Sequence, residues 1–157
     1  KASPIKALPD AKGKRWVLPE RVSYMSRLCT AELRDRGIPV AKENVQFVRE
    51  QGAVPFYMAN GIADVGAVAS YSGVARKLDA DGFRVLHASI KQPYFPLIAS
   101  EQVTPEQVRA IQAALLALPE TADGKALLKT IGVQGFDTGT GERLGQLLAW
   151  LGVDSAK

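Results

Sequence analysis

The stretch KRWVLPERVSYMSRLC, residues 14–29, decides the fold of this chain. Residues 15–18 predict a short apolar strand that ends at Pro19. A polar turn follows, and over residues 23–36 apolar side chains recur at helical spacing before Gly37, a typical helix stop. In an open α/β sheet, small ligands bind where the carboxyl end of a strand faces the start of a helix. We therefore expect one wall of any binding site at this turn.

The same strand-to-helix order repeats along the chain. Further strands are predicted over residues 44–48, 62–69, 83–88 and 94–99, with short helices after the second and third strands. The last third is helical, with starts expected at the capping box of residues 104–107, at Asp123 and at Thr140. Alternating strands and helices predict an α/β fold. We expect a three-layer sandwich lobe with a mainly parallel five-stranded sheet flanked by helices, followed by C-terminal helices.

Length, composition and charge indicate how many domains the chain forms and which classes of partner it suits. The 157 residues, 46% hydrophobic and 23% charged, are typical of one globular domain. We expect residues 1–13 to be a linker or entry segment and residues 14–157 to form a single α/β lobe. A net charge of +4 suits an anionic ligand, but the basic residues are scattered and not interleaved with aromatic ones. This pattern argues against nucleic acid as a partner.

The sequence offers little for catalysis or metal binding. It has one histidine, His87, within a predicted apolar strand, and one cysteine, Cys29, on the apolar stripe of a predicted helix. A single histidine and a single cysteine cannot build a zinc or haem site of familiar spacing. Cys29 is best explained as a small buried hydrophobic residue. We predict a protein that is not an enzyme and that uses neither a metal nor another cofactor.

Polar side chains gather after three of the predicted strands. They would meet at one edge of a parallel sheet, where hydroxyl groups, a guanidinium and the free N–H groups of helix starts suit an oxyanion. Two interpretations of the serines stay open at this point, because serine is also a common helix N-cap without any ligand. These turn residues are Arg21, Ser23, Tyr24 and Ser26 after the first strand, Gln51 and Gly52 after the second, and Ser70, Tyr71 and Ser72 after the third.

Several motifs give the chain a resemblance to a known family. IKALPDAKGKRWV at residues 5–17 is similar to the entry strand of that family, and ANGIADVGAV at residues 59–68 is similar to its segment around a strand aspartate, here Asp64. VLHAS at residues 85–89 resembles its return strand, and GKALL at residues 124–128 its C-terminal helices. The chain thus resembles the second lobe of periplasmic solute-binding proteins of the phosphate, phosphite and phosphonate ABC-transporter type, which have the type 2 periplasmic-binding fold.

This resemblance implies a function and partners. It implies a non-catalytic receptor for a small oxyanion (phosphate, phosphite or a phosphonate-like ligand) that works in the periplasm with the membrane permease of an ABC transporter. It also implies a signal peptide and a first lobe, both absent from this chain, with that lobe closing on this one around the ligand. Ser23, Ser26 and the helix N–H groups would be the anion donors, with Arg21 as the charge partner, while Tyr24 and Ser70 would form polar walls.

A second function of a different class uses the same fold. The lobe could serve as the ligand-sensing domain of a regulator or signalling receptor. Sequence upstream of Lys1 separates the two: a DNA-binding or membrane-spanning segment favours sensing, and a signal peptide with another α/β lobe favours transport. Catalysis is the third interpretation, and loss of turnover on changing His87 would favour it.

Overall fold

The computed structural model describes residues 3–40, 44–92 and 96–153. The chain divides into two compact units, residues 1–91 with 147–157, and residues 92–146. In chain order the elements are the 3-10 helix η1 (Leu8–Ala11), β1 (Arg15–Pro19), α1 (Tyr24–Asp35), β2 (Asn44–Val48), α2 (Ala53–Ala59), β3 (Val65–Gly66), the 3-10 helix η3 (Ala75–Lys77), α3 (Pro105–Ala117), the 3-10 helix η4 (Leu118–Glu120), α4 (Ala122–Ile131) and α5 (Gly141–Trp150).

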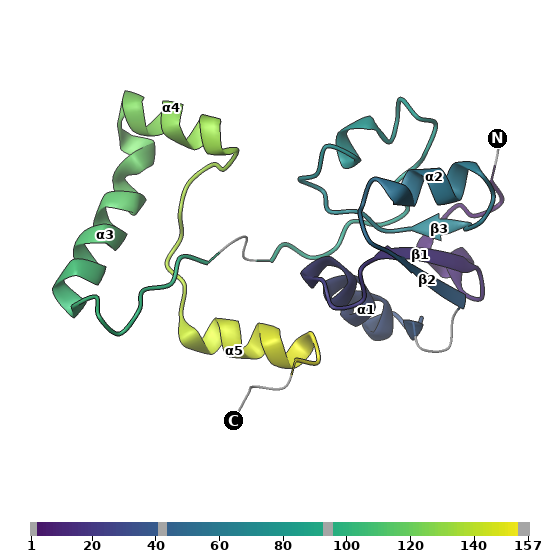
Figure 1. The fold of residues 1–157 in the computed structure, drawn as a ribbon, viewed down its shortest axis with the longest axis horizontal. Helices are drawn as coiled ribbons and strands as arrows, with labels where there is room; N and C mark the ends of the chain where they lie inside the picture. The colour runs from purple at the N-terminus through teal and green to yellow at the C-terminus, as the bar shows by residue number, and fades with distance from the viewer. Residues whose placement is uncertain (1–2, 41–43, 93–95, 154–157) are drawn as a thin grey trace. The chain divides into compact units, whose positions relative to one another are not determined.

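The first unit is built on a parallel sheet with strand order β2-β1-β3 (Figure 1). Its central strand, β1, is buried on both faces because its side chains alternate between two cores. Trp16 and Leu18 belong to the core under α1, and Val17 packs with Val48 and with Val54 of α2 on the other face. The layered α/β fold class predicted from the sequence is therefore confirmed.

Helix α1 begins and ends where local sequence signals place it. Ser23 is its N-cap, since its Oγ accepts a hydrogen bond from the backbone N–H of Ser26 at 3.2 Å. At the other end Gly37 has a φ of 73°, and the next amide, that of Ile38, donates to the Leu33 carbonyl at 2.8 Å. Burial, with a smaller effect of the Glu32 charge, raises the pKa of the Cys29 thiol to about 12. Cys29 is therefore a buried, unreactive part of the core.

The five-stranded sheet predicted from the sequence is not found in the described residues, which contain three strands. The third strand is shorter than residues 62–69, and residues 83–88 form no strand although their apolar side chains alternate. The guanidinium of Arg84 holds this segment by donating to the carbonyls of Ser3 and Ile5, in place of a backbone ladder. Of the fifth expected strand, residues 96–99 form none, and residues 94 and 95 lie outside the described ranges.

The helices of the last third form close to their predicted bounds. Thr104 caps α3 in a reciprocal capping box: its Oγ1 accepts from the Gln107 amide at 3.3 Å, and its own amide donates to Gln107 Oε1 at 2.9 Å. The end of α5 belongs to the first unit, where Leu151 is buried with Leu28 of α1 and the Trp150 indole donates to Asp35 at 2.6 Å. The end of α5 and the residue after it thus pack against α1.

Asp64 lies just before β3 and forms a bidentate pair with Arg15, the first residue of β1. Its Oδ1 and Oδ2 accept from the guanidinium at 2.6 and 3.0 Å, and Oδ2 also accepts from the Arg15 amide at 3.0 Å. The hydrogen bonds from Arg15 outweigh partial burial and lower the pKa of Asp64 to about 2. Asp64 therefore fixes the start of β3 against the start of β1.

Asp64→Asn is expected to lower the melting temperature at pH 7 by about 2–4 °C, which corresponds to a loss of about 1 kcal/mol in a chain of this size. Because the folded pKa is depressed, the stabilisation is present above the unfolded pKa, about 3.9, and is lost as the pH falls towards about 2. Thermal unfolding across this pH range checks the prediction. A difference between the two proteins that persists unchanged at pH 2 would contradict it.

Candidate oxyanion site

A cavity of about 530 Å³ opens at the carboxyl ends of β1 and β2. Strand-end turns surround it: the turn from β1 into α1, the turn from β2 into α2, and the turn that follows β3. This is the sheet edge at which ligands of open α/β folds bind. Its lining consists of Pro19, Glu20, Ser23, Tyr24, Met25, Arg49, Glu50, Gln51, Gly52, Tyr71 and Ser72.

The start of α1 presents hydrogen-bond donors to this cavity. The Ser23 hydroxyl uses a lone pair to cap the helix, so its own proton stays available for a ligand. The backbone N–H groups of Tyr24 and Met25 lie in the first helical turn, where no carbonyl of the helix can accept from them. The helix dipole adds a partial positive charge at the same place. The N-cap role and the ligand role of Ser23 are therefore compatible.

Two further walls come from the turns after β2 and β3. Gln51 Oε1 accepts a hydrogen bond from the Ala69 amide at 2.8 Å, which fixes the side chain and leaves its NH₂ group as a donor. The Tyr24 and Tyr71 side chains border the cavity, with exposed fractions of 41% and 49%. Partial burial, followed by the neighbouring Tyr71, raises the pKa of Tyr24. The Tyr24 phenol is thus a neutral hydrogen-bonding group near pH 7.

The structure brings Ser23, Tyr24, Gln51 and Tyr71 together around one cavity, as expected from the sequence. Four other candidates lie elsewhere. The buried Ser26 hydroxyl donates to the Pro19 carbonyl and ties α1 to the end of β1. The Arg21 guanidinium lies 4.5 Å from the centre of the Phe47 ring, Asp64 pairs with Arg15 at the amino end of β1, and the exposed Ser70 does not line the cavity.

Gly52 and Ser72, which the sequence places among the polar turn residues, also line the cavity, and Arg49 lines it but was missed by reasoning from the sequence. Arg49 follows a strand in the same way as the residues that were chosen. Arg49 comes directly after β2, and Ser72 belongs to the turn that also carries Tyr71. The strand-end rule that selected Arg21 after β1 applies equally to Arg49, and this signal was available in the sequence.

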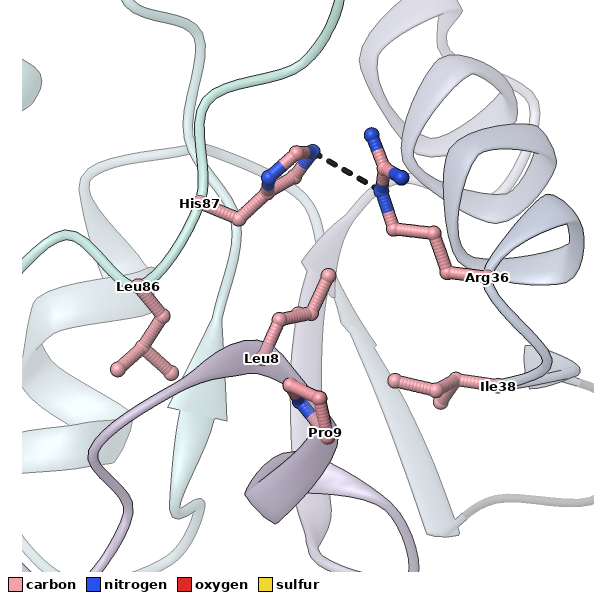
Figure 2. Close-up of a pocket in the computed structure, with 6 residues that line it drawn as sticks. All are labelled: Leu8, Pro9, Arg36, Ile38, Leu86 and His87. Carbon is pink, nitrogen blue, oxygen red and sulfur yellow. Dashed lines mark hydrogen bonds between the residues drawn. The ribbon is translucent and has the colours of Figure 1, made fainter.

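A second cavity of about 460 Å³ is lined by residues that precede β1, by residues that precede β2, and by the segment that carries His87 (Figure 2). Its polar groups are engaged with one another. Glu32 Oε1 lies 2.9 Å from His87 Nε2 and accepts from Arg36 at 2.6 Å. Burial opposes the ionised carboxylate, but the hydrogen bonds from His87 and Arg36 outweigh it, so the pKa of Glu32 is lowered. These hydrogen bonds hold the segment that carries His87 against α1.

The described residues hold no group of three or more histidine, cysteine, aspartate or glutamate side chains that could bind a metal ion. Over the same ranges, no helix is both long enough and apolar enough to cross a membrane.

The fold and the cavity together define a class: an α/β lobe with an anion-compatible site where a strand meets a helix. The model of the phosphonate ABC-transporter periplasmic substrate-binding protein family matches residues 1–144, and the chain belongs to that family. No curated protein matches the chain. The family membership confirms the resemblance seen in the sequence and makes a periplasmic location expected. Substrate-binding proteins of ABC transporters are generally non-catalytic, in agreement with the prediction that this protein is not an enzyme.

Proposed function

We propose that this chain binds a small oxyanion of the phosphonate, phosphite or phosphate type in the cavity at the start of α1, and that it delivers the ligand to the permease of an ABC transporter. One observation carries the proposal: the start of α1, which Ser23 caps, opens into a cavity that further hydrogen-bond donors line. Family membership supports the same ligand class.

The chemistry of the cavity suits a tetrahedral oxyanion. The Ser23 hydroxyl, the first-turn amides of α1 and the Gln51 NH₂ group are neutral donors, which can surround several oxygens of one ligand without strict charge pairing. The two tyrosines add polar, partly apolar walls that can contact an organic substituent. In the proposed receptor, a first lobe supplies the opposite wall and excludes water when it closes, as in other hinged binding proteins.

Isothermal titration calorimetry on the full-length protein tests this function. We expect saturable one-to-one binding of at least one among methylphosphonate, phosphite and phosphate, with sodium acetate at equal ionic strength as the control anion that gives no heat. A thermal-shift assay with the same anions reports binding that happens to have little enthalpy, because a ligand of the folded state raises the melting temperature. Neither heat nor a shift with any of the three anions would refute the proposed function.

A further inference from the structure

The proposed ligand carries one or two negative charges, so the identity of its cationic partner is a central property of the site. Arg21 was the expected partner, but its guanidinium lies over the Phe47 ring and it does not line the cavity. Arg49 does line the cavity. None of the ion pairs formed among the described residues includes Arg49. Its charge is therefore available to a ligand.

The sheet fixes where Arg49 enters the site. In the parallel register of β1 and β2, Pro19 lies beside Val48, so the chain leaves both strands at the same level. Arg49 is the next residue after Val48, and Val48 is anchored because it is buried in the core with Val17 and Val54. The backbone of Arg49 is thus held beside the turn that leads into α1.

The other charges around the cavity favour a cationic partner for the ligand. Glu20 and Glu50 also line it, and their carboxylates repel an oxyanion. Among the described residues that line the cavity, Arg49 is the only arginine or lysine. Its planar guanidinium can give two parallel hydrogen bonds to two oxygens of a phosphonate or phosphate group, a geometry that neither serine nor glutamine provides.

We propose that Arg49 is the charge partner of the bound oxyanion and sets the preference of the site for a doubly charged ligand. This assignment rests on the proposed function. It predicts that loss of the guanidinium weakens binding of a dianion more than binding of a monoanion, because Glu20 and Glu50 are then unopposed.

The test compares Arg49→Gln, Arg49→Lys, Arg21→Gln and the net-charge control Arg109→Gln in calorimetric titrations of the full-length protein with methylphosphonate. Arg109 is exposed on α3 and pairs with Glu106. We expect Arg49→Gln to weaken binding about 10- to 100-fold, the size of a lost charged hydrogen bond, with a weaker dependence of the affinity on NaCl. Arg49→Lys should recover part of the affinity, and Arg109→Gln should match the wild type. The loss should be larger at pH 8.5 than at pH 6, since methylphosphonate is a dianion only at the higher pH.

The outcomes separate the two proposals. If the wild-type protein binds but Arg49→Gln binds within threefold of it, or if Arg21→Gln loses more affinity than Arg49→Gln, the assignment of Arg49 is wrong and the proposed function stands. If the wild-type protein binds none of the oxyanions, both fail. Urea unfolding of Arg49→Gln is expected to match the wild type, because Arg49 is exposed, and this measurement shows that any loss of affinity arises at the site.

Discussion

Ser23→Asp is expected to reduce oxyanion binding at least about 100-fold while leaving the protein folded. Aspartate is as good an N-cap as serine, so its carboxylate can accept the Ser26 amide and complement the helix dipole. The same carboxylate places a negative charge beside the ligand, and two unit charges about 4 Å apart near a protein surface repel by about 4 kcal/mol. Stability and binding should therefore change independently. Calorimetry with methylphosphonate, alongside urea unfolding, measures both.

Ser23→Asn is the matched control for Ser23→Asp. Asparagine also caps helices well and has nearly the shape of aspartate, but it is neutral. We expect Ser23→Asn to retain much more affinity than Ser23→Asp, with a similar urea midpoint. If Ser23→Asp binds within threefold of the wild type, the oxyanion does not lie at the start of α1.

Leu18→Ala is expected to destabilise the protein by about 3 kcal/mol, within the range of about 2–5 kcal/mol seen for leucine-to-alanine changes in cores. Leu18 is fully buried in the central strand, in the core that joins the sheet to α1. Because the Leu18 side chain is enclosed by other core residues, its truncation to alanine leaves a cavity. The midpoint of urea unfolding should fall with little change in slope.

Leu97→Ala is the matched control for Leu18→Ala, because it makes the same chemical change at a side chain that is 69% exposed. Substitutions at such positions usually change stability by less than about 0.5 kcal/mol. A loss of less than 1 kcal/mol in Leu18→Ala, or an equal loss in the two variants, would show that β1 is not the centre of the core.

The parts of the fold that were predictable from the sequence are those set by local signals. Helix α1 is bounded by the Ser23 cap and Gly37, and α3 by the Thr104 capping box, and each signal acts within a few residues. A strand, in contrast, exists only if a neighbour completes its ladder. Residues 83–88 alternate like a strand, but Arg84 ties them to the chain near Ile5 through its side chain, and no local pattern reveals that.

The candidate site likewise has residues whose place was predictable from the sequence and residues whose place was not. Because the strand ends of a parallel sheet meet at one edge, the sequence led to Ser23, Tyr24, Gln51 and Tyr71, which do share a cavity. The surroundings of Arg21 and Asp64 could not be predicted, since they depend on side-chain partners far along the chain. Phe47 lies beneath the Arg21 guanidinium, and the start of β1 pairs with Asp64.

Backbone amide chemical shifts can show whether the oxyanion binds at the start of α1. Methylphosphonate would be titrated into the ¹⁵N-labelled full-length protein. We expect saturable shifts that are largest at the amides of Tyr24 and Met25, which face the proposed ligand, with smaller shifts at Gly52 across the cavity. Shifts centred instead on Arg36, Ile38 and His87 would place the ligand in the second cavity and contradict binding at the start of α1.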